Sequence, residues 1–100
     1  MKIVIQHKDN TLTVSLDGAL DYKATVTMEG LIHDMQQIKA ARVVFDMSKI
    51  ERVDSVGLGM LHLAKDEIIE SGAKMVLRGA SGNVKRLFEL TDSQHSFEIE

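Results

Sequence analysis

Apolar and polar residues alternate along the first part of the chain. Between residues 2 and 7, and again between residues 11 and 16, an apolar side chain recurs at every second position. A period of two is typical of β-strands, whose successive side chains point to opposite faces. Because the polar residues 8–10 form a connection of the length that hairpins use, the two strands are predicted to pair antiparallel.

The hydrophobic spacing becomes helical after Gly18 and Asp21. Between residues 22 and 39 the apolar side chains recur at intervals of two to four, which predicts a helix. Gly30 lies inside this stretch and lowers helix stability by about 1 kcal/mol relative to alanine, so a close packing contact is expected there. The predicted apolar stripe consists of Val26, Met28, Leu31, Ile32, Met35 and Ile38.

Residues 42–47 form a compact apolar run that is β-branched at its centre and too short for a helix. Such a run is typical of a strand covered on both faces, and it is predicted to be the central strand. After residues 48–53, a second helix is predicted to begin at Asp54 and to end at Ser71 and Gly72. Its predicted stripe consists of Leu58, Leu61, Ala64 and Ile68, with Ile69 at the margin.

The last third of the chain continues the alternation of strand and helix. Residues 74–77 are predicted to form a strand, Ser81 or Asn83 to cap a third helix that carries Val84, Leu87, Phe88 and Leu90, and residues 97–99 to form a terminal strand.

The order β-β-α-β-α-β-α-β predicts an α/β fold with one mixed, mostly parallel sheet, an opening hairpin and about three to four helices on its face. Residues 1–100 are expected to form a single domain. The residues predicted to be buried are Val43, Val44, Phe45, Leu58, Leu61, Ile68, Val76, Leu87 and Phe88.

Composition and charge narrow the classes of function. A formal net charge of -3 argues against the basic surface that binding of DNA or RNA requires. No apolar run approaches the roughly 20 residues of a membrane span, and residues 1–8 lack the pattern of a signal peptide, so a cytoplasmic location is expected. Without cysteine there is no thiolate nucleophile, disulfide or zinc-thiolate site.

The four histidines do not indicate a metal site or a cofactor. His33 and His62 are expected on helix surfaces, and His7 and His95 have no partner at the spacing of metal ligands. Neither glycine-rich spacing typical of nucleotide binding, GxxxxGK[ST] or GxGxxG, is present.

An enzyme is the least favoured class. Ser55, His62 and Asp21 supply the side chains of a hydrolase triad, but no GxSxG elbow surrounds the serine.

The segment with most chemical information is residues 54–60, Asp-Ser-Val-Gly-Leu-Gly-Met, at the predicted start of the second helix. A helix N-terminus presents unpaired N–H groups and a positive dipole end to an anion, so a phosphate on Ser55 would be accommodated there. The structural alternative is that Asp54 or Ser55 is an ordinary N-cap. Met60 lies off the apolar stripe, either as an adaptable partner contact or as a partly buried filler.

Three segments carry a family resemblance: residues 18–21 (Gly-Ala-Leu-Asp), residues 54–59 and residues 79–90 (Gly-Ala-Ser-Gly-Asn-Val-Lys-Arg-Leu-Phe-Glu-Leu). With them the chain resembles the STAS domain family, the bacterial anti-sigma factor antagonists. The resemblance covers nearly the whole chain. It implies a regulator, not an enzyme, that is a monomer or weak dimer.

The resemblance also implies a mechanism. In the family, the serine directly after the aspartate is phosphorylated by a partner serine kinase that also binds the sigma factor, and a PP2C-type phosphatase reverses the reaction. Carried over, Ser55 is the acceptor, and Asp21 and Asp54 flank its hydroxyl and repel a phosphate. The implied partner surface continues through Val56, Gly57, Leu58, Gly59 and Met60.

One residue departs from the family pattern. The position after the acceptor is commonly Ser or Thr and is Val56 here, which removes a second acceptor. The alternative function is that of a non-catalytic docking subunit of a bacterial membrane transport complex for lipids, because the same fold serves there.

Overall fold

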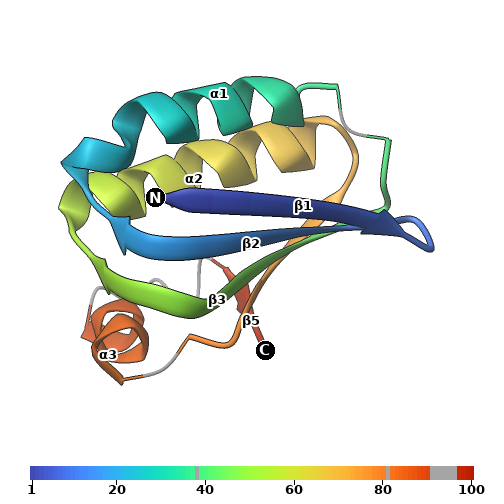
Figure 1. Cartoon of the computed structure of the whole chain (residues 1–100). Coiled ribbons are helices and arrows are strands. Elements are labelled where there is room, and N and C mark those ends of the chain that lie inside the picture. The colour runs from blue at the N-terminus through green and yellow to red at the C-terminus, as the bar shows by residue number, and fades with distance from the viewer. Residues whose placement is uncertain (38, 81, 91–96) are drawn as a thin grey trace.

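Five strands form one sheet in the order β1-β2-β3-β4-β5 (Figure 1). The computed structural model describes residues 1–37, 39–80, 82–90 and 97–100. β1 pairs with β2 antiparallel, and every other neighbouring pair is parallel, so the predicted mixed, mostly parallel sheet is confirmed. The strands are β1 (Lys2–Lys8), β2 (Thr11–Leu20), β3 (Arg42–Val53), β4 (Lys74–Arg78) and β5 (Glu98–Ile99).

The opening hairpin turns on two residues. Asp9 and Asn10 have φ angles of 53° and 62°, the left-handed pair of a type I′ turn. This turn matches the right-handed twist of the flanking strands. The predicted hairpin is therefore confirmed, and its connection is one residue shorter than predicted because Lys8 belongs to β1.

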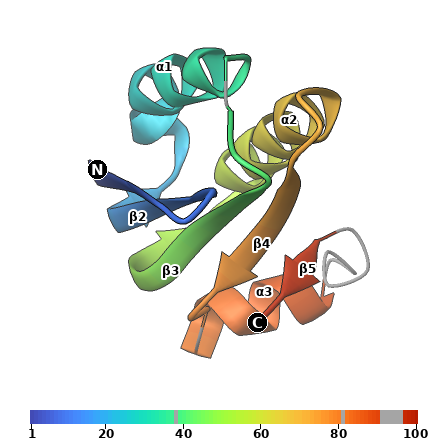
Figure 2. The same cartoon turned by 90° about the vertical axis from the view of Figure 1, so that its right-hand side faces the viewer.

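The helices lie on both sides of the sheet. α1 and α2 lie side by side over one face, whereas α3 contacts β3 from the other side (Figures 1 and 2). The helical elements are the 3-10 helix η1 (Tyr22–Ala24), α1 (Thr25–Met35), α2 (Ser55–Glu70) and α3 (Gly82–Leu90). No helix in the described ranges is long and apolar enough to cross a membrane.

The core forms between the sheet and the pair of helices α1 and α2. Inward-facing residues of β2, β3 and β4 meet the inner stripes of α1 and α2, and Phe88 of α3 belongs to the same cluster. Most of the residues predicted to be buried are buried, but Leu58 and Leu87 are half-buried. Leu58 lies in the first turn of α2 at the edge of the core. On α3, Val84 and Phe88 are the residues that face the core, and Leu87 lies beside them. The buried members of the core include Val14, Leu16, Met28, Leu31, Met35, Val43, Phe45, Met47, Leu61, Ala64, Ile68 and Phe88.

The first helix is shorter than the prediction over residues 22–39. Residues 22–24 form η1, and α1 ends at Met35. Val26 was predicted to lie on the apolar stripe but is 81% exposed, because it lies two residues before the buried Met28 and therefore about 200° around the helix from it. A Cβ at Gly30 would point into open space, so the packing contact expected there is not what explains this glycine. Ile38 lies outside the described residues.

The central strand is longer than the predicted run of residues 42–47. β3 continues to Val53 and pairs along β2, with register shifts between Ser15 and Asp17 and between Gly18 and Ala19. Most residues in this second half of β3 are exposed, so the sequence has no apolar pattern there from which a strand could be predicted. The second half also brings the end of β3 to the start of α2.

The C-terminal elements occupy nearly the predicted positions. α2 ends at Glu70, with Ser71 as its C-cap, and the following Gly72 has a φ of 91°, the left-handed conformation typical of a helix C-terminus. Asn83 lies inside α3 and is not its cap. Ser81, His95 and the side chain of Leu90 lie outside the described residues.

Candidate functional site

β2 and β3 end side by side, and this places two of the three resemblance segments together. Leu20 pairs with Val53, and the backbone N–H of Asp54 donates to the carbonyl oxygen of Leu20 over 3.2 Å. Asp21 and Asp54 thus follow directly after two hydrogen-bonded strand ends, although they are 33 positions apart in the sequence. The carboxyl ends of parallel strands are where sites gather in α/β sheets.

Asp54 is the N-cap of α2. Its backbone is extended, with φ of −101° and ψ of −176°, and its carboxylate accepts a hydrogen bond of 2.8 Å from the backbone N–H of Gly57. Ser55 is the first helical residue and its side chain is exposed. Of the two residues that could have capped the helix, Asp54 performs this role, which leaves the Ser55 hydroxyl at the surface of the first turn.

Asp21 is the one buried charged residue in the described part of the chain, with 4% of its surface exposed. One carboxylate oxygen accepts from the backbone N–H of Lys23 over 2.9 Å, which caps η1. The other accepts from the Arg52 guanidinium over 2.8 Å. The hydrogen bond from Arg52 holds the pKa of Asp21 below its ordinary value, although burial acts in the opposite direction.

The pairing with Arg52 changes the expected electrostatics of the site. Asp21 was expected to repel a phosphate together with Asp54, but its charge is balanced by Arg52. The carboxylate of Asp54 has no such ion pair in the described part of the chain. Repulsion of a phosphate on Ser55 would therefore come mainly from Asp54.

The two glycines of residues 54–59 have different roles. Gly57 is buried, and a Cβ there would lie 1.9 Å from the carbonyl oxygen of Leu20, so a residue with a side chain would force the helix and β2 apart. A Cβ at Gly59 would point into open space. The first glycine is required for the close contact between α2 and the end of β2, whereas no neighbouring residue requires the second.

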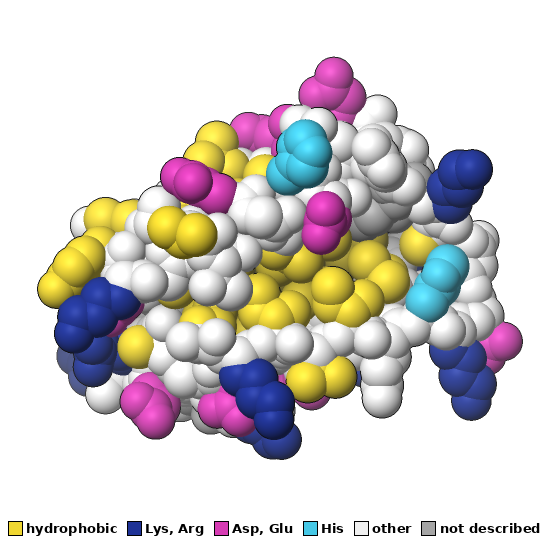
Figure 3. All heavy atoms as spheres, turned by 45° about the horizontal axis from the view of Figure 1, so that its top comes forward, with side chains coloured by type: hydrophobic (Ala, Val, Ile, Leu, Met, Phe, Trp, Pro, Cys, Tyr) yellow, Lys and Arg dark blue, Asp and Glu magenta, His cyan; other side chains and the backbone are white. Residues whose placement is uncertain are grey.

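Exposed apolar side chains lie at the end of the molecule where α1 and α2 begin. Val56 is 44% exposed, Tyr22 of η1 is 64% exposed, and Val26 lies on the first turn of α1. η1 contacts α2, and Figure 3 shows hydrophobic side chains at the end of the molecule where α1 begins. Met60 is buried, so the interpretation of Met60 as a core filler is confirmed and that of an exposed partner contact is wrong.

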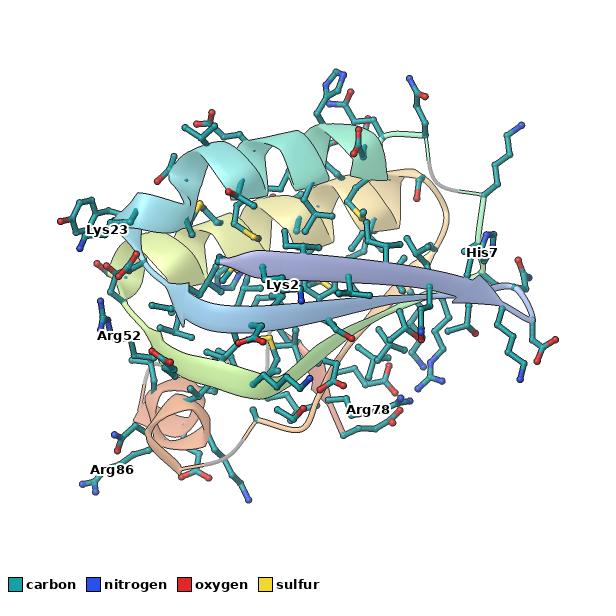
Figure 4. The ribbon with its side chains drawn as sticks, viewed as in Figure 1. Lys2, His7, Lys23, Arg52, Arg78 and Arg86 are labelled. Carbon is teal, nitrogen blue, oxygen red and sulfur yellow. The ribbon has the colours of Figure 1, made fainter. Side chains whose placement is uncertain are left out.

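Sequence reasoning missed Arg52 and Tyr22. Neither belongs to a resemblance segment, and Arg52 reads as one more charge in a polar stretch. Figure 4 shows Arg52 and Lys23 at the end of the molecule where α2 begins. Only the pairing of β2 with β3 reveals that Arg52 reaches Asp21, 31 positions away.

The histidines lie apart from this site. His62 of α2 stacks on Phe97, with 4.6 Å between the ring centroids, which makes it a packing contact to the segment before β5. Figure 4 shows His7 at the opposite end of the molecule from Arg52. Over the ranges that the structure describes, no group of three or more His, Asp or Glu residues could hold a metal ion.

Comparison with known proteins supports one family. The profile of the STAS domain matches residues 2–100. Among solved structures, an anti-sigma factor antagonist from Mycobacterium paratuberculosis is similar, with a TM-score of 0.81, 24% identity, and coverage of 98% of this chain and 83% of that one. The anti-sigma factor antagonist SpoIIAA in its unphosphorylated form has a TM-score of 0.74 and 17% identity, with 99% and 87% covered.

A transport-related protein shares the fold as well. A sulfate transporter family protein from Wolinella succinogenes has a TM-score of 0.78 and 12% identity, with 90% of this chain and 75% of that one covered. At these identities the structural likeness shows the fold, which is shared by proteins of different function.

Proposed function

The chain belongs to the STAS domain family, and from this premise we propose that it is a partner-switching regulator of the anti-sigma factor antagonist type, controlled by reversible phosphorylation of Ser55. The observation that carries the proposal is the position of Ser55. It is the first residue of α2, it is exposed, and Asp54 performs the capping that would otherwise occupy it. The serine is therefore accessible to a partner's active site without loss of the helix cap.

The proposed chemistry takes place in partner proteins. A serine kinase of the anti-sigma factor type transfers the γ-phosphoryl group of ATP: a bond forms between Ser55 Oγ and phosphorus, the bond from phosphorus to the bridging oxygen breaks, and ADP and the hydroxyl proton leave. A PP2C-type phosphatase returns the serine by hydrolysis with water. This chain supplies the acceptor and the docking surface, acts in the cytoplasm and is not itself an enzyme.

The surroundings of Ser55 suit a protein partner. Val56, next to Ser55 in the sequence, Tyr22 of η1 and Val26 of the first turn of α1 are exposed, and η1 contacts α2. Such side chains form the desolvated centre of protein interfaces, where an added charge is most costly. Phosphorylation adds about 1.5 to 2 negative charges, so the phosphorylated chain is expected to leave a partner that the unmodified chain binds.

The fold also suits the alternative, a docking subunit of a membrane transport complex, because a sulfate transporter family protein shares it. The two functions differ in the use of Ser55. In the switch, the serine is modified in the cell, whereas a docking subunit needs it only as a residue of the first helical turn.

Intact-mass and peptide mass spectrometry of the chain purified from its own cells tests the proposal. We expect a population heavier by one phosphoryl group, with the modification on Ser55, and its disappearance in Ser55→Ala. Ser15 on β2 provides a matched control, since Ser15→Ala should leave the modification in place. A chain that stays unmodified under growth and stress conditions would favour the docking subunit instead.

A further inference from the structure

The side chain of Arg52 contacts the buried carboxylate of Asp21 and is also exposed to solvent. Its guanidinium donates to Asp21 over 2.8 Å, while 62% of its side chain remains exposed. A guanidinium carries five N–H donors in a planar fork, so a bond to one carboxylate oxygen leaves capacity for a second anion. The carboxylate, in contrast, is already bonded on both oxygens, to Arg52 and to the backbone N–H of Lys23.

The hydrogen bonds at the ends of β2 and β3 place Arg52 near the start of α2. Asp21, the partner of Arg52, follows Leu20 directly, and the carbonyl oxygen of Leu20 accepts a hydrogen bond from the backbone N–H of Asp54. The carboxylate of Asp54 lies over the first turn of α2, where it accepts from Gly57. Arg52 and its partner Asp21 therefore lie at the end of the molecule where α2 begins, and Arg52 is three positions before Ser55 in the sequence (Figure 4).

We propose that Arg52 is the cation that binds a phosphoryl group on Ser55, exchanging part of its contact with Asp21 for that group. The inference rests on the proposed function, because it assumes that Ser55 is modified. A phosphoserine carries more charge than a carboxylate and offers three acceptor oxygens, and arginine pairs with phosphate through two parallel hydrogen bonds. Asp21 and the phosphoryl group would then compete for the guanidinium of Arg52.

If Arg52 binds the phosphoryl group, it should shift the second pKa of the phosphoserine in a known direction. A neighbouring cation favours the dianion and lowers this pKa. At an exposed ion pair the expected lowering is about half a pH unit. Asp21→Asn removes the competing carboxylate, so Arg52 is freed and the phosphoserine pKa should fall further.

The test uses phosphoserine placed at position 55 during translation, so that no kinase is needed, and follows the phosphorus NMR shift against pH. Arg52→Gln should raise the phosphoserine pKa by about half a pH unit. Arg78→Gln is the matched control, because Arg78 also pairs with a carboxylate, that of Glu100, and lies away from the start of α2 (Figure 4). Arg78→Gln should leave the pKa unchanged.

Arg52→Gln leaves the buried Asp21 without its ion-pair partner and could unfold the chain. Arg52→Gln combined with Asp21→Asn removes both charges, and its phosphoserine pKa should lie above that of Asp21→Asn alone. Equal effects of Arg52→Gln and Arg78→Gln, or no effect of either, would overturn the role of Arg52. The absence of Ser55 phosphorylation in cells would overturn the proposed function and leave this result standing, so the two failures are distinguishable.

Discussion

Gly57 and the carbonyl oxygen of Leu20 are in such close contact that a Cβ at residue 57 would lie 1.9 Å from that oxygen. The contact holds the first turn of α2 against the end of β2, beside the hydrogen bond from Asp54 to the same oxygen. It therefore fixes the position of the helix N-terminus that presents Ser55.

This contact predicts opposite effects for two similar substitutions. Gly57→Ala should lower the free energy of unfolding by about 2 to 3 kcal/mol, because the methyl group overlaps backbone that cannot yield cheaply. Gly59→Ala, in the same helix, should raise it by about 0.5 to 1 kcal/mol, because its methyl group meets open space and alanine favours the helix. Urea denaturation of both variants measures the difference, and equal effects would contradict the contact.

The ion pair of Asp21 predicts a pH dependence of stability. The pKa of Asp21 is lowered in the folded chain, chiefly by the hydrogen bond from Arg52. The folded state therefore binds the proton less readily than the unfolded state, so the stabilisation is complete above the ordinary carboxyl pKa of 3.8 and is lost as the pH falls through the lower folded value.

Asp21→Asn removes this dependence. Between pH 6 and about pH 3, the free energy of unfolding of the wild type should fall more steeply than that of Asp21→Asn. Asp46, whose pKa is also lowered by its hydrogen bonds with Ser48, is present in both proteins and cancels in the comparison. Parallel curves for the two proteins would show that the Arg52 pair does not stabilise the folded state.

Phe97, directly before β5, packs against α2 and α3. It is buried, with the ring of His62 at 4.6 Å and that of Phe88 at 6.4 Å between centroids. Phe97→Ala should cost about 3 to 5 kcal/mol because it removes a large buried ring. Ile99→Ala, two residues later and partly exposed, should cost less than about 1 kcal/mol, and a similar loss in both variants would argue against this anchoring role.

The parts of the fold that sequence reasoning predicted are those with a clear hydrophobic period. β2, the first half of β3, β4 and α2 bury one face or both, and the spacing of their apolar residues shows this. The second half of β3 was missed because its residues are largely exposed. The start of α1 was misplaced because apolar residues in η1 and the first helical turn, Tyr22 and Val26, face solvent while matching a helical period.

The placement of Asp54 and Ser55 at the start of a helix was predictable from the sequence, but the charges around them were not. Asp54, Ser55 and the glycines are consecutive, so one local motif identifies them. The pair formed by Asp21 and Arg52 depends on the pairing of two strands and on the burial of one carboxylate, and no local pattern encodes either. The burial of Met60 likewise depends on how α2 packs on the sheet.

The affinity of the partner kinase for Ser55→Asp tests the central claim most directly, measured by calorimetry beside the wild type and Ser55→Ala. A single carboxylate at a helix N-terminus is favourable by about 0.3 to 1 kcal/mol, so the melting temperature should barely change. Burying that charge in the complex costs several kcal/mol, so Ser55→Asp should bind about a hundredfold more weakly, while Ser55→Ala binds like the wild type. Equal affinities of Ser55→Asp and the wild type would contradict the switch.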